Sequence, residues 1–244
     1  MDVKSKFPIA LLSFRNRYKS DVRIYRLTMI MRPLASVFRI CSTLYGHLSF
    51  INWLNSLPPS RKHPDYLHLA TRQDLWEFLA NNELVQDAGF FFEFGVANGD
   101  GTKFWLERLG QVEYHGFDCF TGMPEDYRQV PKGVFDMSGA PPPDINDARV
   151  TWHIGNVEDT VSAFHFPDSA SRIFLFDLDL YHPTKFVLSK IKPTLRKGDV
   201  LYFDEAWDDA EGIVARDFFD RSTNTQILSS GTGCVAMIVL EGLT

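Results

Sequence analysis

The spacing of apolar residues divides the chain into an N-terminal helical part and a longer part in which strands and helices alternate. Near the N-terminus, apolar residues recur every three or four positions, the period of an amphipathic helix, at Ile24, Leu27, Ile30, Leu34, Phe38, Cys41 and Leu44. The proline-rich, polar stretch 57–64 ends this pattern. We therefore predict an N-terminal helical extension over residues 1–60 and one larger domain over residues 61–244.

The larger part opens with a helix and continues as an alternation of strands and helices. Thr71 and Asp74 have the spacing of a capping box, which predicts a helix start. Apolar runs predict strands at 90–94, 112–117, 150–153, 173–176 and 200–203, and a closing antiparallel pair at 225–228 and 234–240. Periodic stretches predict helices at 101–109, 157–163, 184–194 and 211–221. This alternation favours an α/β fold with a parallel sheet covered on both faces.

One long segment, residues 120–149, has no periodic pattern and contains three consecutive prolines at 141–143. Loops of this length inside a compact domain are commonly functional lids or disordered segments. We expect this segment to be a lid that is mobile in the absence of substrate.

Charge and cysteine content exclude several classes of protein. Residues 1–40 carry a net charge of +7 and residues 41–244 a net charge of −13, so the acidic body argues against nucleic-acid binding. The three cysteines are widely spaced and form no CxxC pair, which favours a reducing cytoplasm over disulfides or a zinc knuckle. The apolar N-terminal runs are short or interrupted by charges, so we expect no stable membrane insertion; an organelle transit peptide is the alternative.

A glycine-rich turn follows the first predicted strand. Residues 93–102 (EFGVANGDGT) place an acid, Glu93, before the first glycine, Gly95. Glycines in such a turn allow positive φ and bring backbone N–H groups close to a ligand. The dinucleotide fingerprint G-x-G-x-x-G, with its acid about 20 residues later, is absent, which argues against a nicotinamide enzyme. The turn predicts a binding site for another small cofactor, with plain structural punctuation as the alternative.

Polar or acidic residues end each of the five predicted parallel strands. They are Glu93, Asp118, Asn156, the pair Asp177 and Asp179, and the pair Asp204 and Glu205. Ligands of open α/β sheets bind beyond the carboxyl ends of the strands. Any one of these residues is also an ordinary turn former, but their recurrence at successive strand ends predicts a site at this edge.

Three of these acids, Asp177, Asp204 and Glu205, follow strands that we expect to be neighbours. Converging carboxylates repel one another unless a cation or a proton compensates them. Oxygen ligands suit a hard ion, so we predict Mg²⁺ at this point. The alternative is that these acids pair with Lys or Arg, or cap the following helices.

The chain resembles the macrocin O-methyltransferase family, class I S-adenosylmethionine (SAM) enzymes that are Mg²⁺-dependent and methylate sugars. The matching stretches include FFFEFGVANGDGT, YHGFDCFTGMPED and IFLFDLDLYHPTKFVLSKIKPTLRKGDVLYFDE, between about residues 66 and 219. Glu205 and Cys119 depart from the family pattern, which has Asp and Ser there. The resemblance implies a Rossmann-like class I methyltransferase sheet of order 3-2-1-4-5-7-6.

The resemblance also implies the roles of the site residues. The cofactor contacts would be Glu93, Gly95, Asn98, Gly99, Gly101, Asp118, Asn156 and Asp177. The metal ligands would be Asp177, Asp204 and Glu205. The candidates for taking a proton are Asp177, Asp179 and His182; a lone histidine such as His182 is commonly a structural or rim residue.

We therefore predict a cytoplasmic enzyme that transfers the methyl group of SAM to a hydroxyl of a glycosylated or polyhydroxylated natural product, with Mg²⁺ assistance. Two alternatives stay open: a metal-independent or nitrogen-directed small-molecule methyltransferase, and a non-catalytic SAM-fold binding module. The expected partner is a small-molecule acceptor and not a nucleic acid. A homodimer is compatible with the sequence, which decides neither the oligomeric state nor the acceptor.

Overall fold

The computed structural model describes residues 34–127, 130–142 and 144–242. The chain divides into two units inside helix α2 (Ala35–Ser56), between Tyr45 and Gly46. The predicted helical positions Ile24, Leu27 and Ile30 lie outside the described residues, whereas the later part of that pattern falls in α2 and is helical as predicted. The domain boundary near residue 60 stays a prediction. None of the described helices is both long and apolar enough to cross a membrane.

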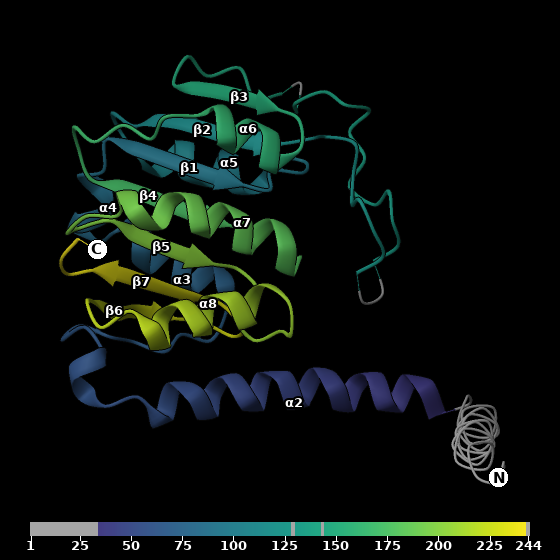
Figure 1. Ribbon diagram of the computed structural model, residues 1–244, viewed down its shortest axis with the longest axis vertical. Helices are drawn as coiled ribbons and strands as arrows, with labels where there is room; N and C mark the ends of the chain where they lie inside the picture. The colour runs from purple at the N-terminus through teal and green to yellow at the C-terminus, as the bar shows by residue number, and fades with distance from the viewer. Residues whose placement is uncertain (1–33, 128–129, 143, 243–244) are drawn as a thin grey trace, which may run out of the picture. The chain divides into compact units, whose positions relative to one another are not determined.

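The unit that begins at Gly46 contains a seven-stranded sheet in the order β3-β2-β1-β4-β5-β7-β6, as predicted (Figure 1). Neighbouring strands are parallel except that β7 runs antiparallel to both β5 and β6. The strands are β1 (Phe90–Phe94), β2 (Glu113–Asp118), β3 (Val150–Ile154), β4 (Arg172–Phe176), β5 (Val200–Phe203), β6 (Thr225–Ser230) and β7 (Val235–Val239). Strands β1 to β5 therefore all end at the same edge of the sheet.

Helices cover both faces of this sheet, with α6, α7 and α8 on one face and α3, α4 and α5 on the other (Figure 1). Their bounds are α3 (Arg72–Ala80), α4 (Glu83–Gln86), α5 (Asp100–Arg108), α6 (Val157–Ala163), α7 (Tyr181–Ile191) and α8 (Glu211–Arg221), with short 3₁₀ turns η2 (Pro59–Arg61) and η3 (Lys192–Thr194). The capping box predicted at Thr71 and Asp74 is formed at the start of α3.

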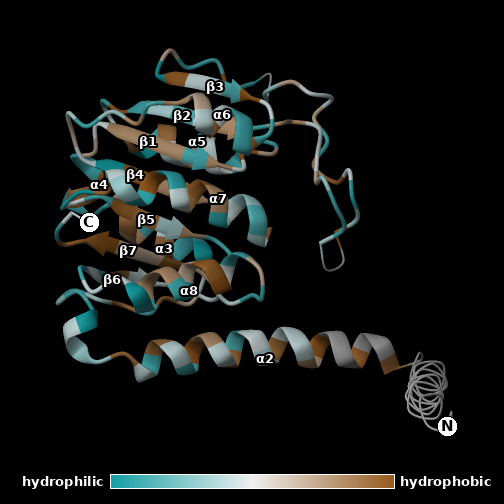
Figure 2. Ribbon diagram, in the orientation of Figure 1, coloured by the Kyte–Doolittle hydropathy of each residue, from teal (hydrophilic) through white to brown (hydrophobic). Residues whose placement is uncertain are grey.

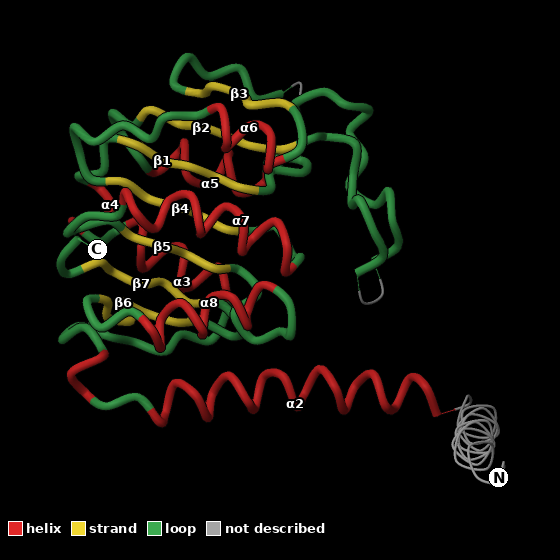
Figure 3. Tube along the Cα trace, in the orientation of Figure 1, coloured by secondary structure: helices red, strands yellow, loops and turns green. Residues whose placement is uncertain are grey.

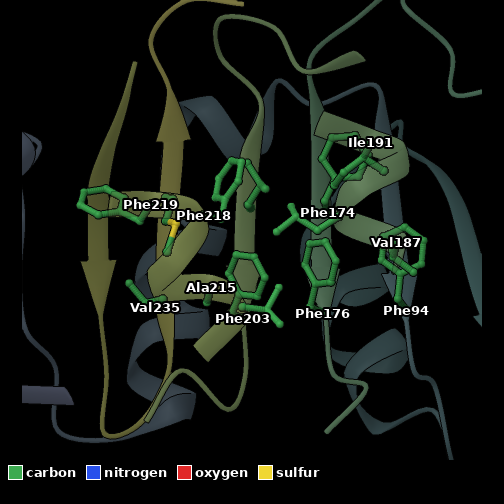
Figure 4. Close-up of a cluster of buried hydrophobic side chains, with 14 of the residues drawn as sticks. Phe94, Phe174, Phe176, Val187, Ile191, Phe203, Ala215, Phe218, Phe219 and Val235 are labelled. Carbon is green, nitrogen blue, oxygen red and sulfur yellow. The ribbon is translucent and has the colours of Figure 1, made fainter. Parts of the chain in front are cut away.

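The strands are apolar on both faces, so successive side chains enter two separate cores. On one face, Phe94, Phe176 and Phe203 pack beneath α7 and α8, and the rings of Phe176 and Phe203 stack with centroids 4.5 Å apart (Figure 4). On the other face, Phe91 and Tyr202 belong to the core under α3 and α5. Figure 2 shows β5 and β7 mainly in the colour of hydrophobic residues. Burial on both faces explains the near-continuous apolar runs from which the strands were predicted.

The largest differences from the predicted elements lie at the two ends of α7. The helix begins at Tyr181, three residues before the predicted start, and includes Pro183 in its first turn. First-turn N–H groups have no acceptor inside the helix, so a proline there removes no hydrogen bond. The helix also ends at Ile191, three residues before the predicted end, and the 3₁₀ turn η3 covers the remaining residues. The other boundaries differ from prediction by two residues or fewer.

The segment between β2 and β3 runs beyond the carboxyl edge of the sheet as a long loop (Figure 3). Its described residues contain no helix and no strand, only the isolated bridges Thr121–Asp136 and Tyr127–Val130. Its last residue, Arg149, is fixed by hydrogen bonds to the backbone carbonyls of Leu106 and Leu109 at 2.7 and 2.6 Å. The predicted irregular segment is confirmed; its mobility stays a prediction.

Candidate active site

A cavity of about 1080 Å³ lies at the carboxyl ends of the parallel strands. Its walls come from the turns after β1 to β5, from the start of α3 and from the long loop after β2. It gathers nearly all of the predicted site residues: Glu93, Gly95, Asn98, Gly101, Asp118, Asn156, Asp177, Asp179, His182, Asp204 and Glu205. Gly99 is placed differently: it is the N-cap of α5, and a side chain there would meet Pro142 and Ile145.

Glu93 lies at the end of β1 with only 2% of its surface exposed. Its Oε2 accepts hydrogen bonds from Thr102 Oγ1 and from the Tyr114 hydroxyl, the latter at 2.9 Å. Burial raises the pKa of Glu93 to about 8, although these two hydrogen bonds oppose the shift. The carboxyl group therefore favours its neutral form at neutral pH unless a cation binds beside it.

The glycines that flank Glu93 are required by packing inside the protein. A Cβ at Gly95, where φ is +91°, would lie 1.9 Å from the carbonyl oxygen of Asp177. A Cβ at Gly101 would lie 2.5 Å from Glu93 Oε1. Neither position accepts a side chain, so the glycine-rich turn packs tightly against the ends of β1 and β4.

Asp118 ends β2 and joins two turns. Its Oδ2 accepts the N–H groups of Val96 and Ala97, both at 2.8 Å, and its Oδ1 accepts the N–H group of Phe120 at 2.7 Å. A carboxylate oxygen accepts about two hydrogen bonds. Oδ1 therefore retains one acceptor position toward the cavity, whereas Oδ2 is fully used in holding the glycine-rich turn.

The next turns carry two predicted amide contacts. Asn98 donates from Nδ2 to Asp100 Oδ2 at 2.8 Å, so this side chain stabilises the turn after β1. Asn156 is exposed at the cavity wall, at the N-cap of α6, and makes no capping hydrogen bond with its side chain.

The turns after β4 and β5 bring several acids close together. Asp204 is buried, and it accepts hydrogen bonds from Arg72 Nη1 on Oδ2 and from the Tyr202 hydroxyl on Oδ1, both at 2.7 Å. Burial and then the charge of Asp204 raise the pKa of Asp177 well above its usual range. The same two causes raise the pKa of Glu205 to about 8. Glu205 Oε2 is buried and has no hydrogen-bond partner among the described residues.

The comparisons with known proteins support the fold. No protein-family model and no curated protein matches the chain. The crystal structure of the calicheamicin methyltransferase CalS11 aligns with a TM-score of 0.54 and 23% identity, over 79% of this chain and 91% of that one. The O-methyltransferase NovP aligns with a TM-score of 0.51 and 16% identity, over 69% and 79%. The chain has the class I methyltransferase fold.

Within this methyltransferase fold, the three carboxylates predicted to bind Mg²⁺ do not form a metal site. No three His, Cys, Asp or Glu side chains in the described ranges lie close enough together to hold an ion. Both oxygens of Asp204 are engaged by Arg72 and Tyr202, so the acid proposed as a shared ligand already has a cationic partner. The arrangement matches the alternative in which these acids pair with an arginine, and it does not fit the predicted magnesium site.

Two charged residues that the sequence did not identify organise this end of the cavity. Arg72 is the first residue of α3 and lies 132 residues before Asp204. Glu211 is fully buried at the start of α8, and its carboxylate accepts the N–H groups of Leu178 and Glu205 at 3.1 and 3.2 Å. Glu211 therefore ties together the turns after β4 and β5. Acids in the first turn of a helix are also common on exposed surfaces, so no pattern in the sequence predicts that Glu211 is buried.

The remaining predicted residues lie around the same opening. His182, the second residue of α7, is exposed at the cavity wall. Asp179 has a φ of +60°, a conformation that non-glycine residues seldom adopt. The long loop reaches the turn after β5, where the Tyr127 hydroxyl donates to Asp208 Oδ2. Trp207, also at the wall, stacks on His47 with ring centroids 4.1 Å apart.

Proposed function

We propose that this protein is a SAM-dependent methyltransferase that methylates a hydroxyl group of a small molecule. One observation carries the proposal: the glycine-rich turn after β1 and the acids that end β1, β2, β4 and β5 line a single cavity at the carboxyl edge of the sheet. CalS11 and NovP, which share the fold, are both methyltransferases.

The cofactor would lie against β1, β2 and β3. When bound, SAM supplies an electrophilic methyl group on its sulfonium. Glu93 would accept a hydrogen bond from the ammonium group of the cofactor. The free acceptor position of Asp118 Oδ1 would accept a hydrogen bond from one ribose hydroxyl. Asn156 would contact the adenosine from the turn after β3. Gly95 and Gly101 allow the turn to pack tightly against Asp177 and Glu93, which holds its backbone at the cavity wall.

The acceptor would lie between the turns after β4 and β5 and the long loop. Transfer breaks the sulfur–methyl bond, forms an oxygen–methyl bond and releases the hydroxyl proton. Asp177 is our candidate to receive that proton, because it lines the cavity and its raised pKa makes its carboxylate a stronger base than that of an ordinary aspartate. Asp179 and His182 line the same wall and are the other candidates.

The acceptor class is a further part of the proposal. We propose a hydroxyl on a glycosylated or polyhydroxylated natural product, on the basis of the sequence resemblance described above. CalS11 is itself described as a calicheamicin methyltransferase. The Arg72–Asp204 ion pair favours transfer without a metal ion, so we assign no step to Mg²⁺.

Isothermal titration calorimetry with SAM and S-adenosylhomocysteine tests the proposal. We expect both ligands to bind with release of protons at pH 7, because the ligand ammonium lowers the pKa of Glu93 from about 8. Binding enthalpies in buffers of different ionisation enthalpy measure that release, which Glu93→Gln should abolish. Absence of SAM binding to the folded wild type would contradict the proposed function.

A further inference from the structure

Arg72 combines an ion pair with access to the cavity. The capping box at Thr71 and Asp74 fixes the start of α3 and thereby the backbone of Arg72. Its side chain is 43% exposed and lines the cavity, while Nη1 donates to Asp204 Oδ2 at 2.7 Å. The other N–H donors of the guanidinium have no acceptor among the described residues. One edge of the group is therefore anchored and the rest is available to a ligand.

Arg72 is linked to Glu93 through one aromatic side chain. Its guanidinium carbon lies 5.1 Å from the ring centroid of Trp76, which also lines the cavity. The Trp76 ring reaches within 3.7 Å of the point where a Cβ of Gly101 would lie, and that point is 2.5 Å from Glu93 Oε1. A cation and an acid thus line the same cavity, and both lie close to Trp76.

This pair of opposite charges matches the two charges of an α-amino acid. The methionine part of SAM carries an ammonium, which suits Glu93, and a carboxylate, which requires a donor. Among the described residues that line the cavity, the only Lys or Arg side chains are Arg72 and Lys132. Lys132 belongs to the exposed long loop, whereas Arg72 is held by Asp204 and lies against Trp76, whose ring reaches toward Gly101 of the glycine-rich turn. A planar guanidinium can bind two carboxylates at once through different N–H groups.

We propose that Arg72 binds the carboxylate of the methionine part of SAM while it holds Asp204. This inference rests on the proposed function and adds a residue that defines which end of the cavity receives the amino-acid group. It also gives the Arg72–Asp204 pair a role in orientation: Asp204 fixes the guanidinium so that its remaining donors face the ligand.

The test compares SAM with decarboxylated SAM, which lacks only the carboxylate and keeps both the ammonium and the sulfonium. Calorimetry on the wild type should show tighter binding of SAM. Arg72→Met should weaken SAM binding by about 10- to 100-fold, the effect of losing charge-assisted hydrogen bonds. The same substitution should leave the affinity for decarboxylated SAM unchanged or raise it, because Asp204 is then free to attract a cationic ligand.

Arg108→Met is a matched control. Arg108 also forms an ion pair with an acid, Glu77, and stacks on an aromatic ring, Phe104 at 3.8 Å, but it lies outside the cavity lining. Its loss should change neither affinity. Arg72→Met leaves the buried carboxylate of Asp204 without its partner, which can destabilise the fold. The double variant Arg72→Met/Asp204→Asn removes that charge as well. Thermal unfolding checks that both variants are folded.

The outcomes separate cleanly. If both Arg72 variants lose affinity for SAM but not for decarboxylated SAM, the inference is supported. Equal losses for the two ligands, or no loss for either, overturn it and leave the proposed function standing. Failure of the folded wild type to bind SAM overturns the proposed function, and this inference with it.

Discussion

The two ends of the cavity differ in how their charged groups are satisfied. At the cofactor end, Glu93 and Asp118 accept hydrogen bonds from Thr102, Tyr114 and three backbone N–H groups. At the acceptor end, Glu205 Oε2 is buried without a partner among the described residues, and repulsion between acids contributes to the raised pKa of Asp177 and Glu205. The acids of one end are held by internal hydrogen bonds, whereas the other end contains a buried carboxyl oxygen that a hydrogen-bond donor of a ligand would satisfy.

The largest effect that we expect concerns Glu93 and pH. Its pKa is about 8 in the folded protein and near 4.5 when exposed, so the folded state holds an extra proton between these values. Stability should fall as pH rises through this window, by roughly 1.4 kcal/mol per pH unit at most. Glu93→Gln should remove its own contribution to the slope, as measured by urea unfolding at several pH values, while Asp177 and Glu205, whose pKa values are also raised, keep theirs. Glu107→Gln, an exposed acid on α5, should keep the wild-type slope; a wild-type slope in Glu93→Gln would contradict the assignment.

Substitution of Asp118 should have a smaller effect, on both the stability of the fold and the affinity for SAM. Asp118→Ala removes the acceptor of three backbone N–H groups and the proposed ribose contact. We expect a loss of roughly 1.5–3 kcal/mol in SAM binding, together with a lower urea midpoint. Asp118→Asn keeps one acceptor oxygen and should lose less on both counts. If Asp118→Ala bound SAM like the wild type, its carboxylate would serve the turn alone.

The contrast between the two ends also explains what the sequence could predict. Strand β1, Glu93 and the glycine-rich turn follow one another in the sequence, so a local pattern predicts them. The apolar residues of β1 reflect burial on both faces of the sheet, and the glycines reflect positions 95 and 101, where a Cβ would clash. The sheet order came from the family resemblance, and the structure confirms it.

The acceptor end was less predictable because its geometry depends on contacts between distant residues. Arg72 reaches Asp204 across 132 positions, and no local pattern marks that pair. Contacts between separate turns also limited the prediction at the cofactor end, where Asp118 was predicted as a cofactor contact but accepts three backbone N–H groups. The metal prediction was based on the carboxylates alone, because no sequence pattern indicated that Arg72 pairs with Asp204.

A still smaller effect is expected where the long loop reaches the acceptor end. Tyr127→Phe removes the hydrogen bond to Asp208, whose Oδ1 also accepts the N–H group of Gly212 in the first turn of α8 at 2.6 Å. The net loss should be about 0.5–1.5 kcal/mol and local to the loop. Hydrogen exchange should become faster in the loop residues near Tyr127 while the sheet stays protected. Unchanged exchange in the loop would show that this bond does not hold it.

The smallest expected effect is that of a divalent ion. If Arg72 supplies the positive charge beside Asp204, adding Mg²⁺ should leave the melting temperature and SAM affinity of the wild type unchanged, and EDTA should do the same. This result is decisive because a site occupied at 100 times its Kd would stabilise the fold by about 2.7 kcal/mol, a readily measured shift. Electron paramagnetic resonance of Mn²⁺ gives a direct second readout. In Arg72→Met only Asp204 loses its cationic partner. Because the acids of the described residues form no group close enough to hold an ion, Mn²⁺ binding should stay absent in this variant as well. Tight Mn²⁺ binding by the wild type that depends on Asp204 would instead restore the magnesium site expected from the sequence, with Arg72 displaced by the ion.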